Sequence, residues 1–146
     1  MDTEIRIERV LPAGIGRVYD AWTRAELLSQ WYCPNPAWDL KVQADVRVGG
    51  DYVVEMGPHV VRGIYLEVEP PHRLAFSWKW DGTEDEPTRV QVELTEVADG
   101  TRMLLTHTDF ATEEDAANHR MGWEPEMGRL AALLTAQQPD PAPDRA

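Results

Sequence analysis

The sequence predicts a single α+β domain in which a curved antiparallel sheet wraps around a long C-terminal helix. Segments with a two-residue apolar period fill the middle of the chain, the connections between them are short, and one long helical stripe follows. With 146 residues, 42% of them hydrophobic, the chain can bury a core without disulfides or metal. We expect residues 1–136 to form the domain and the proline-rich residues 137–146 to form a disordered tail.

The N-terminal part predicts one strand and two short helices. Residues 3–11 alternate as a strand does, and Pro12 and Gly14 end the alternation. Thr23 separates the two helices and is the expected N-cap of the second. Their apolar residues recur at helical spacing: Val18, Trp22, Leu27, Leu28 and Trp31.

Six strands are expected next, each with one apolar and one polar face. Asp99-Gly100 is typical of a hairpin turn before the last of them, and the acidic segment 81–87 is expected to be a solvated loop. The expected strands cover residues 38–45, 51–56, 59–69, 73–80, 90–95 and 101–110.

The last predicted element is a helix that begins at Thr112, whose spacing from Asp115 resembles a capping box. Gly122 and Pro125 predict a kink or a separate first turn. The apolar stripe of this helix consists of Trp123, Met127, Leu130 and Leu134. A single helix rarely fills the concave face of so wide a sheet, so we expect a cavity between them.

Composition argues against several classes of partner. A net charge of −12 and the absence of a basic stripe predict no nucleic-acid binding. No apolar run approaches the roughly 18 residues of a membrane-spanning helix, so no membrane partner is expected. The acidic N-terminus and the single cysteine, Cys33, favour a cytoplasmic protein. We expect Cys33 to be unreactive and partly buried against Trp31.

The inward faces of the strands and the helical stripe supply the candidate ligand-binding residues. They are Trp31, Tyr52, Met56, Tyr65, Trp78, Trp80, Met103, His107, Phe110, Trp123 and Met127. Met121 is expected in the same region, because methionine adapts to ligands of varied shape. Ordinary core packing is the alternative explanation for each of these residues.

Catalytic signals are weak in this sequence. His107 shares the inward face of its strand and, with Tyr65, is the candidate for proton transfer, although a hydrogen-bonded core histidine is the alternative. His59, His72 and His119 are expected to be exposed. Ligand spacings for a metal and a nucleophile motif are both lacking, so no metal site and no cofactor is expected.

Several segments together resemble the START-like SRPBCC superfamily and, within it, the family named after the activator of heat-shock-protein-90 ATPase. They are residues 18–23 (VYDAWT), 28–31 (LSQW), 45–50 (DVRVGG), 63–74 (GIYLEVEPPHRL), 100–107 (GTRMLLTH) and Gly122-Trp123. The resemblance covers residues 3–135. It implies a helix-grip fold, a ligand-accommodating cavity and frequent homodimers, but no shared catalytic motif.

Three functions are therefore considered. The first is binding or carriage of a small hydrophobic molecule, without catalysis. The second is a cyclase or aromatase acting on a polyketide-like substrate, with His107 or Tyr65 moving protons. The third is a chaperone-accessory interaction module of the stress response that uses the acidic exterior.

Overall fold

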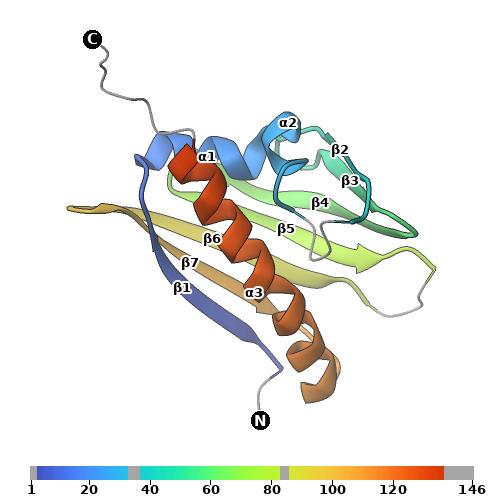
Figure 1. The fold of residues 1–146 in the computed structure, drawn as a ribbon. Helices are drawn as coiled ribbons and strands as arrows, with labels where there is room; N and C mark the ends of the chain where they lie inside the picture. Colours follow the sequence, from blue (N-terminus) through green and yellow to red (C-terminus); the bar gives the residue numbers. More distant parts are fainter. Residues whose placement is uncertain (1–2, 33–36, 83–85, 137–146) are drawn as a thin grey trace.

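The computed structural model describes residues 3–32, 37–82 and 86–136. Strand β1 (Ile5–Leu11) is followed by helices α1 (Ile15–Thr23) and α2 (Ala25–Leu28) (Figure 1). Six strands and the long helix α3 (Glu113–Ala136) come next. The strands are β2 (Leu40–Ala44), β3 (Asp51–Met56), β4 (His59–Glu69), β5 (Arg73–Trp80), β6 (Thr88–Val97) and β7 (Gly100–Thr108).

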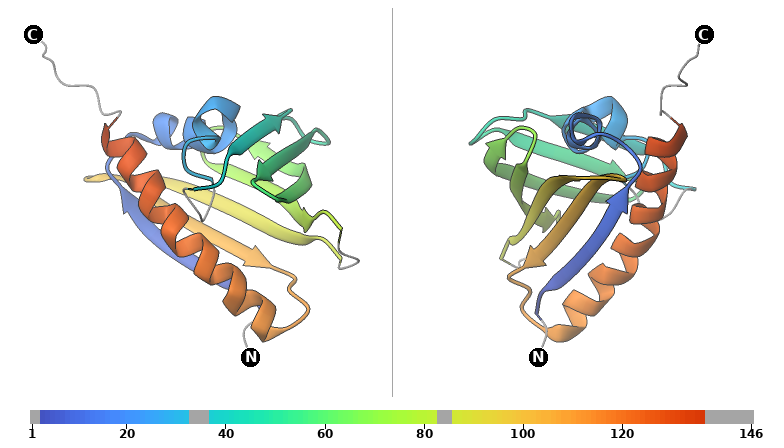
Figure 2. Two further views of the ribbon diagram at one scale, coloured as in Figure 1. Left: turned by 45° about the vertical axis from the view of Figure 1, so that its right-hand side comes forward. Right: turned by 90° about the vertical axis from the view of Figure 1, so that its left-hand side faces the viewer.

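The seven strands form one antiparallel sheet in the order β1-β7-β6-β5-β4-β3-β2. Every consecutive pair from β2 to β7 is hydrogen-bonded, as short connections dictate, and β1 closes against β7. Figure 2 shows that the sheet is bent between its two halves and that the helices lie on its concave side. This confirms the predicted helix-grip architecture.

The predicted alternation determines which side chains face the helices. In β3, Tyr52, Val54 and Met56 are buried while Asp51 and Glu55 are exposed. The hairpin expected at Asp99-Gly100 is present, because Val97 pairs with Gly100 across a two-residue turn. The interior is therefore filled from one face of each strand.

Two expectations about the helices are wrong, those for Thr23 and Met121, and of the kink or separate first turn expected in α3 the separate turn is absent. Thr23 is not an N-cap: it ends α1 and donates its hydroxyl to the carbonyl of Tyr19, and Arg24 takes the cap position without a side-chain bond. No separate first turn interrupts α3, which runs continuously through Pro125. Pro125 faces solvent, where water can satisfy the carbonyl of Met121 that loses its donor. Met121 is itself 73% exposed, because it lies on the opposite face from Trp123.

The start of α3 agrees with the sequence, since the Asp115 backbone N–H donates to Thr112 Oγ1 over 3.0 Å. Cys33, residues 83–85 of the acidic loop and the 137–146 tail lie outside the described residues.

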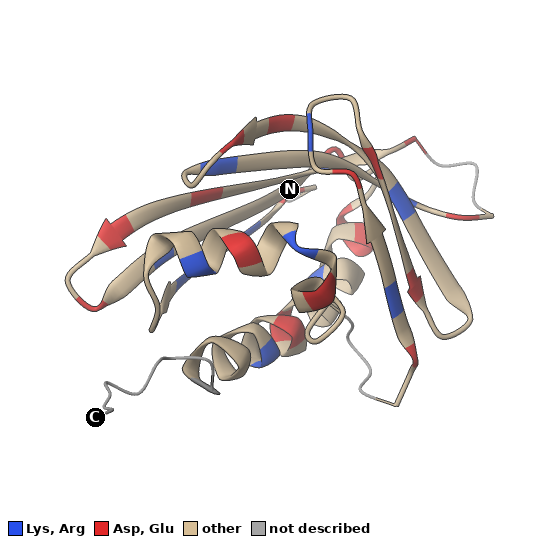
Figure 3. Cartoon of the chain, turned by 90° about the horizontal axis from the view of Figure 1, so that it is seen from above, with Lys and Arg blue, Asp and Glu red and all other residues tan. Residues whose placement is uncertain are grey.

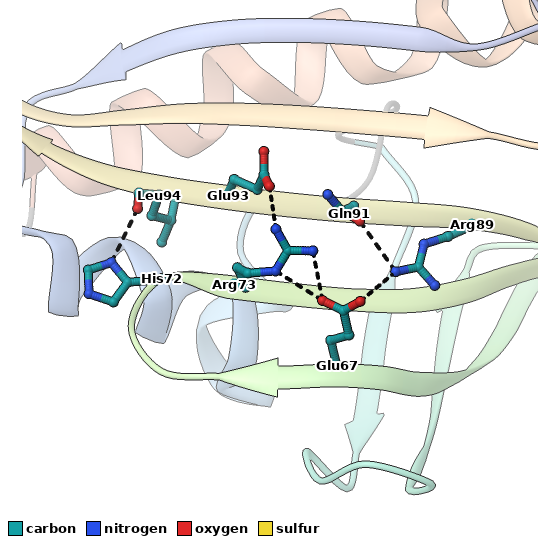
Figure 4. Close-up of polar contacts among 7 residues, drawn as sticks. All are labelled: Glu67, His72, Arg73, Arg89, Gln91, Glu93 and Leu94. Carbon is teal, nitrogen blue, oxygen red and sulfur yellow. Dashed lines mark hydrogen bonds and ion pairs between the residues drawn. The ribbon is translucent and has the colours of Figure 1, made fainter.

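The outer face of the sheet is held by charged side chains (Figure 4). Arg73 on β5 donates to Glu67 on β4 over 2.8 and 3.0 Å and also pairs with Glu93 on β6. Arg89 donates to the other oxygen of Glu67 over 2.9 Å, and these hydrogen bonds lower the pKa of Glu67. Figure 3 shows acidic and basic residues interspersed over strands and helices.

Gly63 on β4 permits a close approach between strands. A Cβ at this position would overlap the backbone oxygen of Ser77 and come within 2.5 Å of Tyr52 Cε2. The Tyr52 hydroxyl donates to that same Ser77 oxygen over 2.7 Å, so the ring is held across the glycine.

Gly63→Ala should therefore lower the free energy of unfolding by about 1–3 kcal/mol, the usual cost of overpacking. Gly16→Ala is the matched control, because a Cβ there meets nothing within 4 Å and lies in a helix. That substitution should be neutral or stabilise by up to about 1 kcal/mol. Urea denaturation of both variants measures the difference, and equal stabilities would contradict the close packing at Gly63.

Candidate functional site

An apolar cavity of about 330 Å³ lies between the first half of α3 and strands β3 to β5, and we call it the main cavity. A larger hollow of about 470 Å³, lined mostly by polar surface, lies around Trp38, Lys41 and Glu55. This is at the lower end of the roughly 300–1,000 Å³ found for small-molecule sites. Its lining consists of Trp38, Met56, His59, Trp78, Trp80, Asn118, His119, Gly122, Trp123 and Glu126. Four of these ten residues are tryptophans.

Burial distinguishes the floor of this cavity from its mouth. Met56, Trp78, Trp123 and Glu126 are all at most 5% exposed and form the floor. His59 and Asn118 are exposed, so they lie at the mouth. A ligand entering there would pass from polar side chains to indole rings.

Strand β5 and helix α3 are joined across the site by a hydrogen bond. Trp80 Nε1 donates to His119 Nε2 over 2.9 Å, and His119 Nδ1 lies 2.8 Å from the carbonyl oxygen of Asp115. Because Nε2 accepts, Nδ1 carries the proton and donates to that carbonyl. Both residues also line a second hollow of about 150 Å³ that includes Phe110. The Trp80–His119 pair therefore separates two cavities.

His107 is fully buried beside this site, and both of its ring nitrogens have partners. Trp123 Nε1 donates to Nδ1 over 3.0 Å, so Nε2 carries the proton and faces Thr88 Oγ1 at 2.7 Å. Thr88 in turn donates to the carbonyl of Trp78. Burial, together with the nearby His119, lowers the pKa of His107 to about 3. His107 is therefore neutral near pH 7, and its bonds fix the orientation of the Trp123 ring.

Glu126 is a buried acid, and one of its two carboxyl oxygens lacks a hydrogen-bond partner among the described residues. It is 4% exposed, and its Oε1 atom has no hydrogen-bond partner in the described part of the chain. Burial raises its pKa well above the ordinary value, and the charge of Arg129 one turn later opposes this only partly. A buried carboxyl oxygen without a hydrogen bond costs free energy.

Other unpaired polar groups surround this part of the interior. The indole nitrogens of Trp22 and Trp78 and the hydroxyl of Tyr32 are buried without a hydrogen-bond partner among the residues described. The rings of Tyr32 and Trp78 are in edge-to-face contact with centroids 5.8 Å apart. Trp22 and Tyr32 also line a crevice of only about 10 Å³ with Tyr52 and Tyr65. Aromatic rings thus fill much of the space that the curved sheet encloses.

The predicted site residues divide among these spaces. Met56, Trp78, Trp80 and Trp123 line the main cavity, Phe110 lines the second hollow, and Tyr52 and Tyr65 line the crevice. Trp31, Met103, His107 and Met127 are buried at 0–2% exposure and line none of the three. Trp31 donates its indole N–H to the carbonyl of Ala21 and packs edge-on against Trp22.

Sequence reasoning missed several lining residues, Glu126 above all. Glu126 occupies the third position after Trp123 and precedes Met127, so a charged residue interrupts an apolar stripe. This interruption was the feature of the sequence that could have identified Glu126 as a buried functional residue. His119 was expected to be exposed, but it is half-buried and hydrogen-bonded, which corrects that expectation. Trp38 lies just before β2 rather than within it.

The fold and the cavity define a class of protein: a helix-grip domain with an apolar pocket between its sheet and its C-terminal helix. The model of the family described as "Activator of Hsp90 ATPase homolog 1-like protein" matches residues 12–135, and the chain belongs to that family. Comparison with curated proteins gives no match.

Solved structures of similar proteins share the whole fold. Protein CV1439 from Chromobacterium violaceum is 27% identical, with a TM-score of 0.82 over 92% of this chain and 98% of its own. CalU16 from Micromonospora echinospora is 26% identical, with a TM-score of 0.75 over 97% of this chain and 78% of its own. DynU16, described as a putative protein in the dynemicin biosynthetic locus, matches at 24% identity and a TM-score of 0.81. That match covers 94% of this chain and 49% of DynU16.

Across residues 3–32, 37–82 and 86–136, no helix combines the length and the apolar character needed to cross a bilayer.

Proposed function

We propose that this protein binds a small hydrophobic molecule that carries one polar group, in the cavity between α3 and strands β3 to β5. The observation that carries this proposal is the lining of that cavity, in which four tryptophans accompany a buried Glu126 whose Oε1 atom has no hydrogen-bond partner among the described residues. A cavity made only for packing would not keep a carboxyl that costs free energy when empty. A ligand that occupies the site can supply the missing hydrogen bond.

Carriage without catalysis is supported better than a cyclase activity. The pKa of His107 is depressed to about 3 and both of its nitrogens are engaged, so it has no free position for a substrate proton. Burial raises the pKa of Tyr65, which keeps its phenol protonated. DynU16, which shares the fold, is described as a putative protein in the dynemicin biosynthetic locus. In the present chain, however, His107 and Tyr65 are poorly suited to acid–base chemistry.

Binding can be tested with a neutral apolar fluorophore, N-phenyl-1-naphthylamine. Trp80→Ala removes one wall of the cavity and should weaken binding at least tenfold, or about 1.4 kcal/mol. Met121→Ala, on the exposed side of α3, is the matched control and should bind like the wild type. Native mass spectrometry of freshly purified protein should also show a retained small molecule. If the wild type neither binds the probe nor retains a small molecule, the proposal is refuted.

The cytoplasmic location, the homodimer, the stress response and a chaperone-accessory role stay predictions. A homodimer is expected from the family resemblance, and sedimentation of the full chain measures it. An accessory role would appear as capture of a partner that is lost at high salt, since surface ion pairs are screened.

A further inference from the structure

We infer that the polar group of the ligand is a cation, so that the cavity takes a hydrophobic ammonium compound with the nitrogen between the indole rings and Glu126. This inference rests on the proposed function and names the chemical class of its ligand. It is carried by three features of the cavity: the arrangement of the rings, the single carboxyl, and the charge of the lining.

The indole rings form walls at different angles, as a cage requires. Trp78 and Trp80 are perpendicular, with an interplanar angle of 89° and centroids 5.7 Å apart. Trp123 is tilted by 42° from Trp78 at 5.6 Å. The His59 ring lies between two further walls, because its centroid is 5.0 Å from that of Trp38 and 5.9 Å from that of Trp80. Faces of several aromatic rings around one space attract a cation through their quadrupoles, and tryptophan does so best.

Two of these walls are held in place by hydrogen bonds. Trp80 donates to His119 and Trp123 donates to His107, so the orientations of their rings are set before any ligand arrives. A pre-organised cage loses less conformational entropy on binding than a mobile one. The two bonds also use the indole N–H groups of Trp80 and Trp123, so these donors are already engaged when a ligand arrives.

The charges favour a cation over an anion. Among the described residues that line the cavity, Glu126 is the only Asp or Glu, and none is Lys or Arg. Arg129, the cation that acts on Glu126, lies outside the lining and has contacts of its own. The whole chain carries a net charge of −12, which raises the local concentration of cations. An apolar ligand would leave Glu126 Oε1 unsatisfied, and an anion would meet no Lys or Arg among the described lining residues, while the net charge of the chain lowers its local concentration.

The inference predicts coupling between binding and a proton. Burial raises the pKa of Glu126 and so favours its protonated form in the empty site, whereas a cation stabilises the carboxylate. The other titratable groups nearby are Arg129, the Tyr32 phenol, and His59 and His119 in the lining. Binding of a permanently charged ligand should therefore release a proton from Glu126, and its affinity should rise with pH.

Three probes of one shape test this. Benzyltrimethylammonium is the cation, neopentylbenzene is its neutral isostere, and pivalophenone has a carbonyl acceptor in a similar frame. At pH 8 we expect the wild type to bind the cation at least tenfold more tightly than either neutral compound. Calorimetry in two buffers of different ionisation enthalpy should show proton release for the cation alone. Tighter binding of pivalophenone would overturn the inference and assign the site to a neutral acceptor, and tighter binding of neopentylbenzene would overturn it too.

Glu126→Gln keeps the size of the side chain and removes its charge. It should weaken binding of benzyltrimethylammonium at least tenfold and abolish the proton release. Glu124→Gln is the matched control, since Glu124 is exposed on the same helix and pairs with Arg9. If the fluorophore binds but the cation shows no preference for the wild type over Glu126→Gln, the cationic ligand is refuted and the pocket stands. If nothing binds the wild type, the proposed function fails.

Discussion

Replacing Trp123 by alanine should lower the free energy of unfolding by about 3–5 kcal/mol, the usual cost of deleting a buried aromatic side chain. Trp123 is 3% exposed and contacts the rings of Trp22, Tyr32 and Trp78 at centroid distances of 5.6–6.1 Å. It also donates to His107, so its removal leaves a buried acceptor unpaired. The free energy of unfolding of a domain is only about 5–15 kcal/mol, so this loss would remove a large fraction of the stability.

Urea denaturation followed by circular dichroism measures this loss. Trp123→Phe separates packing from hydrogen bonding, because it keeps an aromatic ring and loses only the N–H group and part of the area. Its cost should be intermediate, with about 1–3 kcal/mol arising from the unpaired nitrogen of His107. Leu133→Ala on the same helix is a matched control in a half-buried position and should cost less. A loss below 1 kcal/mol for Trp123→Ala would mean that this ring does not join α3 to the sheet.

Acid should destabilise the fold through His107. Burial, together with the nearby His119, lowers the pKa of His107 to about 3 in the folded protein, whereas the same imidazole has a pKa of 6.5 in the unfolded chain. The unfolded state therefore binds more protons between these values, and stability is lost as the pH falls. The contribution of neutral His107 to the free energy of unfolding is fully present above pH 6.5. It declines by about 1.4 kcal/mol per pH unit below that value. Over the whole interval the loss is on the order of 5 kcal/mol.

The comparison with His107→Gln isolates this effect, because carboxyl groups titrate in both proteins. The wild type should be the more stable protein at pH 7.5, since glutamine cannot keep both hydrogen bonds of the ring. Its advantage should shrink steadily as the pH falls from 6.5 to 4.5. Glu126 acts in the opposite direction, because its raised pKa lowers stability as the pH rises, and it is present in both proteins. A constant difference between the two proteins across this range would rule out a depressed pKa at His107.

Local patterns in the chain were enough to predict the strands. The period of two in residues 51–56 placed Tyr52, Val54 and Met56 inside, and the structure confirms it. The stripe of α3 was found in the same way, because Trp123, Met127, Leu130 and Leu134 are all buried. These features depend on which face of an element is apolar, and that information lies within a few residues of sequence.

The site was predicted only in part, for reasons that local patterns do not contain. Trp31 and Trp80 look alike in sequence, yet one is fully buried beside Trp22 and the other lines the cavity. Their difference arises from where the sheet bends and how α3 crosses it. His119 could not be separated from an exposed histidine, because its partner Trp80 is 39 residues away in the chain.

The sequence alone determined the order of the elements, the inward face of each strand and the buried stripe of the last helix, because the apolar periodicity of each segment specifies these. Only the tertiary structure decided that rings close most of the space beneath the sheet and leave about 330 Å³ beside Glu126. It also decided that His107 is held neutral between Trp123 and Thr88. The physical reason is that burial and hydrogen-bond partners come from residues distant in the chain, which meet only when the sheet curves around α3.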